Sequence, residues 1–214
     1  LAIEDTRFYE HGGVDWIRAL GAAKANIGDF GSQGASTITM QVARNFFLSR
    51  DKTMPRKLLE VALAWKIEKA LSKDQILEVY LNQIYLGQRA YGFASAARTY
   101  FGKPLAELSL AEMAMLAGLP QNPSSSNPVS NPQAARKRQQ VVLRRMRELA
   151  MISEPQYRRA LAEPLQVRSH GAGVNPRAAW VAEIARQAVH ARLGQAAYER
   201  GVTVITTIIA AEQD

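Results

Sequence analysis

The chain has 214 residues, 47% of them hydrophobic, which is enough for one domain with a real core and excludes a disordered chain. It contains no cysteine, so disulfides, thiol nucleophiles and cysteine-based zinc sites are excluded. The net charge of +8 favours an anionic partner, which could be nucleic acid, acidic lipid or a phosphorylated substrate.

The first pattern of chemical interest lies at the start of the chain and reads Glu4-Asp5-x-x-Phe8-x-x-His11-x-Gly13. Apolar surface beside these acids would partly desolvate a carboxylate and make it a better proton acceptor near neutral pH. An ordinary acidic helix end fits the same residues about equally well. Adjacent acids on a helix point about 100° apart, so we expect only one of them in a cleft. His11 is expected to fix the motif by hydrogen bonding more than to carry protons.

The segment Val14–Phe30 is predicted to be an amphipathic helix. Its apolar residues recur on one helical face and are Trp16, Ile17, Leu20, Ala23 and Ile27. Such a face can pack on a protein core, which the periodicity alone slightly favours, or lie in a bilayer interface.

Two polar patterns follow along the chain. The segment Gly34–Gln41 has hydroxyl and amide groups that could wrap a phosphate or a sugar, although a helix cap explains them equally well. In Arg56-Lys57-x-x-Glu60, a helix that begins near Pro55 would bring Glu60 within reach of both cations. The alternative for this trio is a weak surface ion pair.

The rest of the chain is dominated by helix signals. Capping boxes are predicted at Ser72-x-x-Gln75, Ser109-x-x-Glu112 and Ser153-x-x-Gln156, and Asn131-Pro132 should begin a long helix that reaches about Met151. A turn-rich stretch, 167–176, separates this helical body from a final helix near Ala178–Leu193 and a β-branched tail, 202–208. We therefore predict an all-α domain over 1–166 and a linker region over 167–214 with a short helix and a strand-like end.

A second basic cluster lies on the long helix and contains Arg136, Lys137, Arg138, Arg144, Arg145 and Arg147. No pair of carboxylates is nearby in sequence, so we interpret this cluster as a solvated or membrane-facing surface. The histidines are too scattered to suggest a local metal site, and no protein-held metal is predicted.

Taken together, these patterns resemble the peptidoglycan glycosyltransferases, which form the polymerising domain of class A penicillin-binding proteins and of monofunctional transglycosylases. Further motifs that carry the resemblance are Lys73-x-x-Ile76-Leu-Glu-x-Tyr80-Leu81-Asn82, Ala90-Tyr-Gly92 with Tyr100-Phe101-Gly102-Lys103, and Leu116-Ala-Gly-Leu-Pro120. The chain departs from the family at Met40, where a glutamine is usual, but it keeps Gln41. The tail is similar to the segment that leads class A proteins toward a transpeptidase domain, which implies a longer, bifunctional parent.

The resemblance implies a lysozyme-like helical fold and a lipid-linked disaccharide substrate, lipid II, that is added to a growing glycan chain. It implies that Glu4 is the general base and that Glu60 supports the catalytic site. Lys52, Arg56 and Lys57 would stabilise the departing undecaprenyl diphosphate, assisted by a divalent cation such as Mg²⁺ or Mn²⁺ that the diphosphate carries. The other substrate-binding residues implied are Asp5, Ser36, Thr37, Gln41, Arg44 and Asn82.

The same resemblance implies work at the periplasmic or extracytoplasmic face of the inner (cytoplasmic) membrane. A polyprenyl substrate tail cannot leave the bilayer cheaply, which shifts our interpretation of Val14–Phe30 toward docking on anionic lipid. Because the first motif begins almost at the first residue, we expect the upstream helix and membrane anchor to be missing from this chain.

Two other functions compete with this one. A lysozyme-like lytic enzyme would use a glutamic acid to protonate a glycosidic oxygen, but it would not need Arg56 and Lys57 beside the site. A basic nucleic-acid-binding protein would leave the spaced acids unexplained, and no recognised nucleic-acid-binding signature is present. We therefore expect no nucleic acid partner.

Overall fold

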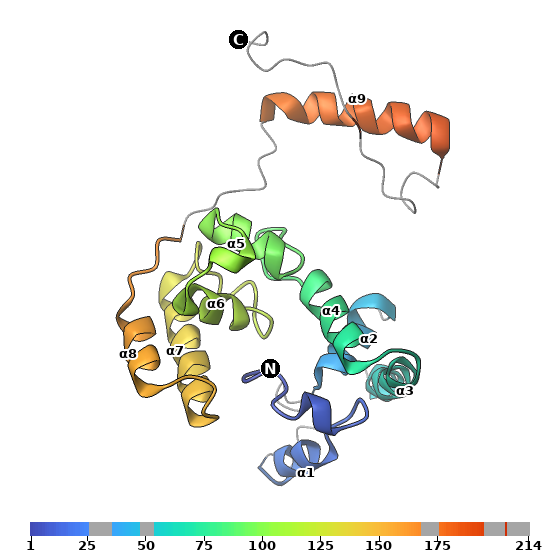
Figure 1. Ribbon diagram of the computed structural model, residues 1–214. Helices are drawn as coiled ribbons and strands as arrows, with labels where there is room; N and C mark the ends of the chain where they lie inside the picture. Colours follow the sequence, from blue (N-terminus) through green and yellow to red (C-terminus); the bar gives the residue numbers. More distant parts are fainter. Residues whose placement is uncertain (26–35, 48–53, 168–175, 195–203, 205–214) are drawn as a thin grey trace. The chain divides into compact units, whose positions relative to one another are not determined.

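The computed structural model describes residues 1–25, 36–47, 54–167, 176–194 and 204. The chain forms two compact units, Leu1–His170 and Gly171–Asp214 (Figure 1). Within the described ranges the structure is helical, with one isolated antiparallel bridge between Tyr85 and Tyr91, so the all-α prediction is confirmed there. The predicted strand-like tail lies outside the described residues except for Val204.

The first unit contains eight α-helices and two short 3-10 helices among its described residues. In chain order these are η1 (Phe8–Glu10), α1 (Trp16–Ala25), α2 (Ile38–Phe47), α3 (Met54–Ala70), α4 (Lys73–Gln83), α5 (Phe93–Phe101), η2 (Leu105–Glu107), α6 (Leu110–Ala117), α7 (Pro132–Glu148) and α8 (Glu154–Ala162). The second unit contains α9 (Pro176–Leu193) at the place where the sequence predicts its last helix.

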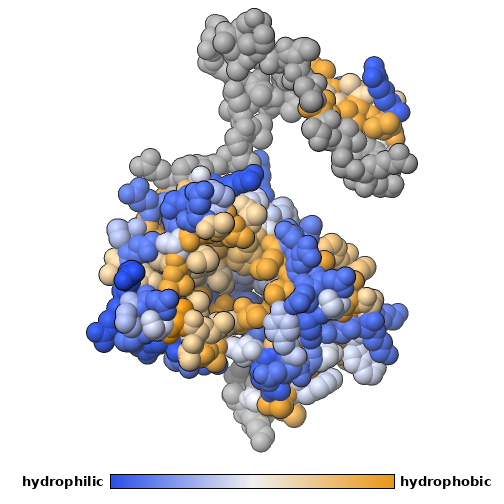
Figure 2. Space-filling model, viewed as in Figure 1, coloured by the Kyte–Doolittle hydropathy of each residue, from blue (hydrophilic) through white to orange (hydrophobic). Residues whose placement is uncertain are grey.

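The helices of the first unit pack as two groups. In one group α2 packs against α3 and α4, and in the other α7 packs against α6 and α8. Helix α5 contacts both α4 and α6 and so joins the groups (Figure 1). On the face shown in Figure 2, apolar residues gather in a hollow of this unit.

Local sequence signals explain where several helices begin. The capping boxes predicted at Ser72, Ser109 and Ser153 are all present, with each serine side chain accepting from the backbone N–H three residues later. The Asn131 side chain caps α7 in the same way, and Pro132 is in its first turn. A cap of this kind contributes about 1 kcal/mol, so these residues help to fix the helix boundaries.

The core near the junction of the two groups depends on one tyrosine. Tyr100 on α5 is fully buried, and its hydroxyl donates to the backbone oxygen of Leu86 at 2.7 Å and accepts from Asn127 at 3.0 Å. Burial raises the pKa of Tyr100 to about 12. Gly87, the residue after Leu86, has a φ of +87°, and a Cβ there would lie 2.7 Å from the Tyr100 hydroxyl. Only glycine fits this turn.

Candidate active site

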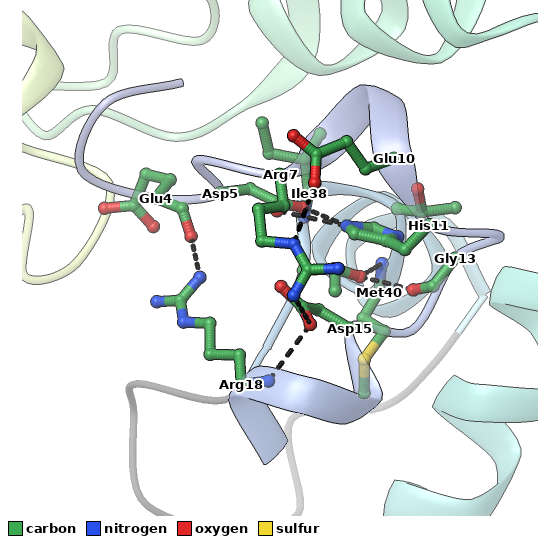
Figure 3. Close-up of polar contacts among 12 residues, drawn as sticks. Glu4, Asp5, Arg7, Glu10, His11, Gly13, Asp15, Arg18, Ile38 and Met40 are labelled. Carbon is green, nitrogen blue, oxygen red and sulfur yellow. Dashed lines mark hydrogen bonds and ion pairs between the residues drawn. The ribbon is translucent and has the colours of Figure 1, made fainter. Parts of the chain in front are cut away.

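Glu4 lies between the two helix groups and is partly open to solvent, with 15% of its side chain exposed. From α2, Gln41 donates a hydrogen bond from Nε2 to Glu4 Oε2 at 2.9 Å. From α7, the Arg138 guanidinium is 3.7 Å from Glu4 Oε1. From α1, Arg18 donates to the Glu4 backbone oxygen at 2.5 Å (Figure 3). Glu4 is therefore held in place by three helices while part of its carboxylate stays accessible.

Asp5 occupies the opposite environment from its neighbour because its carboxylate is fully buried. Both of its oxygens lie 3.1 Å from His11 Nε2, and Oδ2 also accepts from the Ile38 backbone N–H at 3.0 Å (Figure 3). A carboxylate at the start of α2 is favoured by the helix dipole. His11 has the hydrogen-bonding role expected of it, and this geometry makes Asp5 a residue that shapes the site from inside the fold.

The two adjacent acids thus face different surroundings, as expected, but for a different reason. Residues 4 and 5 lie in a turn rather than a helix, and contacts with α2 bury Asp5 while leaving Glu4 partly open. The two acids differ in exposure as predicted, but the prediction assumed a helix that these residues do not form.

The start of α2 is built by the hydroxyls of the second motif. The Thr37 hydroxyl oxygen accepts from the Met40 backbone N–H at 3.2 Å, which caps the helix, and donates to the Gly13 backbone oxygen at 2.6 Å. Thr37 is fully buried, so its hydroxyl ties two motifs together inside the fold. Ser36 is only half-buried, and its hydroxyl oxygen lies 2.8 Å from Lys57 Nζ on α3.

Met40, the departure from the family pattern, is a packing residue. Its side chain is buried in a small cluster with Val14 and Ala64. The next residue, Gln41, still points its amide at Glu4. The methionine therefore fills apolar space without removing the polar contact beside it.

The third motif forms the predicted trio on α3. Glu60 is fully buried, and its carboxylate oxygens lie 3.0 Å from Lys57 Nζ and 3.6 Å from Arg56 Nε. The i,i+3 and i,i+4 pairs expected from the sequence are therefore confirmed. Since Glu60 is buried, they are not the weak surface pairs of the alternative interpretation, and removing a partner from a buried pair typically costs about 3–5 kcal/mol.

The two acidic regions are connected through α2. Lys57 contacts Ser36 just before this helix, Asp5 accepts from its first N–H, and Gln41 one turn later donates to Glu4. Residues in and just before the first turn of α2 thus hold both a cationic region and a partly open carboxylate. That arrangement can receive an anionic group at Lys57 and a proton at Glu4.

Tyr80 on α4 adds a buried group on the Glu4 side. Burial raises the pKa of its hydroxyl, the Glu4 carboxylate raises it further, and Arg44 opposes the shift. Tyr80, Glu4 and Arg44 therefore share one electrostatic environment. Arg44, in the last turn of α2, is half-buried there.

Asn82 lies at the end of α4, away from the hydrogen bonds of Glu4 and Glu60. Its exposed side chain donates to the Glu78 backbone oxygen at 3.0 Å. It also lines a mostly apolar groove of about 560 Å³, together with Leu77, Leu81, Phe93, Met113 and Leu116. Lys52 lies outside the described residues, so its predicted position next to the cations has no counterpart here.

The interpretation of the second basic cluster as a plain surface is wrong for two of its members. Arg138 faces Glu4, and Arg136 donates to Gln139 Oε1 and to the Leu161 backbone oxygen. These arginines reach inward because α7 packs against the rest of the unit, which a count of charges along the sequence does not show. Sequence reasoning also missed Arg18, whose partner is a backbone oxygen and leaves no charge pattern.

In the described part of the chain, no group of three or more His, Cys, Asp or Glu side chains could hold a metal ion. None of the helices described is both long enough and apolar enough to cross a bilayer.

Comparisons with known proteins bear on the family. The family model described as transglycosylase matches residues 1–147. A Cupriavidus necator protein named "putative transglycosylase" is 65% identical over 168 residues, covering 78% of this chain and 73% of that protein. Penicillin-binding protein 1A of Neisseria meningitidis is 51% identical over 217 residues, covering 100% of this chain. The crystal structure of penicillin-binding protein 1A from Haemophilus influenzae matches 75% of this chain and 20% of that chain, at 34% identity and a TM-score of 0.47.

The chain spans only 27% of the length of the Neisseria meningitidis protein. Its match to the family model nevertheless takes in the first three motifs, all of α1 to α6 and most of α7. The chain therefore belongs to the transglycosylase family, the peptidoglycan glycosyltransferases.

Proposed function

We propose that this domain polymerises lipid II into β-1,4-linked glycan strands with inversion at the anomeric carbon. Glu4 takes the proton from the 4-hydroxyl of the acceptor sugar, and that oxygen forms a bond with the anomeric carbon of the growing chain. The bond from this carbon to the diphosphate oxygen breaks, and its electron pair leaves with undecaprenyl diphosphate. The observation that carries the proposal is a partly open carboxylate and a cationic region fixed on one helix, α2.

The cations of α3 suit the leaving group. Lys57 and Arg56 already hold Glu60, and 31% of the Lys57 side chain is exposed and can meet a diphosphate. Charge-assisted hydrogen bonds of this type are about twice as strong as neutral ones. In the proposal Lys52 adds to the same region, and Glu60 keeps both α3 cations in position.

Neutral and cationic groups on α2 and just before it would hold the sugar and phosphate parts of the donor. Ser36 and Gln41 of the second motif, together with Arg44 farther along α2, have accessible or site-facing groups. The buried Thr37 and Asp5 would instead set the shape of this region. Asn82 would act at the groove beside α4 and α5.

A divalent cation fits this site only as a companion of the substrate. The Glu60 carboxylate is occupied by protein cations, and the described residues form no cage for a metal. Mg²⁺ or Mn²⁺ would therefore be held by diphosphate oxygens and water. When bound it would neutralise part of the diphosphate charge.

The exposed face of α1 supports docking on a membrane. Trp16, Ile17 and Leu20 are 64%, 67% and 65% exposed, so this face is not packed in a core as the alternative requires. An exposed apolar helix face with nearby basic residues suits the headgroup region of anionic lipid. Ala23 and Ile27 lie where side chains are not described. The lipid tail of the substrate would stay in the bilayer while its diphosphate reaches α3.

The relatives support a proposal about the cellular setting of the domain. We infer that the natural protein works at the periplasmic face of the inner membrane, with an upstream anchor and a transpeptidase domain beyond this chain. The penicillin-binding protein names of relatives that this chain covers only in part support that inference.

A lytic enzyme is the second candidate and is disfavoured by α3. A hydrolase of glycosidic bonds releases a sugar hydroxyl and gains nothing from cations beside the site. Incubation of the protein with labelled lipid II in detergent or vesicles, followed by separation of polymer from monomer, tests the choice. Polymer should appear with the wild type, whereas shortening of preformed glycan without polymer would favour the lytic enzyme.

A further inference from the structure

Arg138 is the cation of α7 that faces Glu4 in the described part of the chain. Its Nη2 lies 3.7 Å from Glu4 Oε1, and only 20% of its side chain is exposed. Its Nε lies 3.4 Å from the Gly118 backbone oxygen, at the end of α6. One edge of the guanidinium therefore contacts the end of α6, and another edge faces the Glu4 carboxylate.

Gly118 makes room for this arginine. A Cβ added at Gly118 would lie 2.8 Å from the Arg138 Cγ, closer than such atoms approach in real structures. The backbone of Gly118 has ordinary right-handed dihedrals, so its conformation alone does not require glycine. Glycine is required at position 118 because the Arg138 side chain passes close to it on its way to Glu4.

The charged groups around Glu4 single out Arg138 as the cation that faces its carboxylate. Burial lowers the pKa of Arg138, and the Glu4 carboxylate opposes that shift. Among the described residues, the other charged or titratable groups near Glu4 include the Leu1 amino group and Tyr80, while Arg18 reaches its backbone oxygen. Asp5 beside it is paired with His11. Arg138 is thus the guanidinium that faces the Glu4 carboxylate.

We propose that Arg138 is a positioning residue for Glu4, and this inference rests on the proposed function. Its guanidinium faces Oε1, which leaves Oε2 to Gln41 and fixes the direction of the carboxylate. The two carboxylate oxygens thus have one partner each, Arg138 from the α7 group and Gln41 from the α2 group. The packing of the two helix groups around Glu4 therefore directs the base toward the acceptor hydroxyl.

The test separates kcat from KM in lipid II polymerisation by Arg138→Gln, Arg138→Lys and the wild type. Without the guanidinium the Glu4 carboxylate is less well aimed, so kcat of Arg138→Gln should fall about tenfold while KM stays close to that of the wild type. Arg138→Lys should recover most of the lost kcat.

Two controls separate positioning from other roles. Lys137→Gln removes the same charge from an exposed neighbouring position and should leave kcat unchanged. Gly118→Ala keeps the charge but displaces the Arg138 side chain, and it should lower kcat in the same way but by less. It also serves if Arg138→Gln fails to fold.

The possible results are distinct. If wild-type protein makes no polymer, the proposed function itself fails. If the wild type is active and Arg138→Gln raises KM with an unchanged kcat, Arg138 binds substrate and the positioning role is overturned. An equal loss of kcat in Lys137→Gln would also overturn it, because the general field of α7 would then explain the effect.

Discussion

Glu4 is held by side chains from distant parts of the chain, whereas Glu60 is held by two cations of its own helix. Gln41 and Arg138 reach the Glu4 carboxylate from α2 and α7, and part of that carboxylate stays open. Glu60 is fully buried between Arg56 and Lys57, which lie one turn before it on α3. The two acids of one site thus have opposite solvent access and opposite kinds of support.

This difference matches the two tasks in the proposed reaction. A proton acceptor must meet the substrate, so Glu4 needs access and must be aimed by the assembled fold. A residue that holds cations in place for a diphosphate works best when it is buried and pre-organised, which α3 achieves alone. Loss of Glu4 should therefore stop chemistry, whereas changes near Glu60 should show first in binding.

The largest effect is expected from Glu4→Gln, which keeps the shape of the side chain but removes the base. Polymerisation of lipid II should fall by at least about 10²-fold, the lower end of what a positioned proton acceptor contributes. Thermal unfolding should stay close to that of the wild type, because the side chain is partly exposed. Glu10→Gln, at a carboxylate with 65% of its side chain exposed, is the matched control. Near wild-type turnover by folded Glu4→Gln protein would end the assignment of the base.

The second effect concerns the other acid region. Lys57→Ala should weaken binding of diphosphate-bearing donor analogues by about tenfold or more, since a charge-assisted hydrogen bond is lost. Binding of diphosphate-free glycans should change much less. Lys66→Ala, at an exposed position of the same helix, controls for net charge. Equal losses for both ligand classes would show that Lys57 only supports the fold.

Much of the Glu60 region could be predicted from sequence, because its contacts are local. The spacing of Arg56, Lys57 and Glu60 fixes which side chains meet once α3 is a helix. The caps at Ser72 and Ser109 were predictable for the same reason, since each depends on residues only three positions apart.

The Glu4 region could be predicted only in part. The motif identified the acids, but it did not show that Asp5 would be buried against α2 or that Arg138 would arrive from α7. Those contacts depend on how helices pack, and no periodicity along the chain encodes them. The charge of Arg138 was visible in the sequence, but its direction depends on the space left by Gly118.

A smaller effect is expected from Arg18, which supports Glu4 through the backbone. Arg18→Gln removes the charged donor to the Glu4 oxygen, so we expect turnover to fall about fivefold through looser placement of the base. Because the carboxylate keeps Gln41 and Arg138, the loss should stay well below that of Glu4→Gln. Arg98→Gln, at an exposed position of α5, should leave turnover unchanged. A loss as large as that of Glu4→Gln would contradict the ranking.

The smallest effect is spectroscopic and compares two tryptophans, one on each side of this site. Trp16 lies on α1, the helix that contacts Glu4 through Arg18, and Trp65 lies on α3, the helix of Glu60; they are 64% and 63% exposed. Two single-tryptophan proteins, each with the other tryptophans replaced by Phe, report the two helices separately. When anionic vesicles are added, Trp16 fluorescence should shift to the blue, since the apolar face of α1 enters the interface. Trp65, with Lys69 over its ring at 5.1 Å, should shift less.

An unchanged Trp16 spectrum despite vesicle binding would rule out α1 as the docking element, and a larger shift at Trp65 would move docking to α3. Docking through α1 would leave Lys57 exposed to the diphosphate at the membrane surface, and Arg18 would link the base to the helix that enters the lipid.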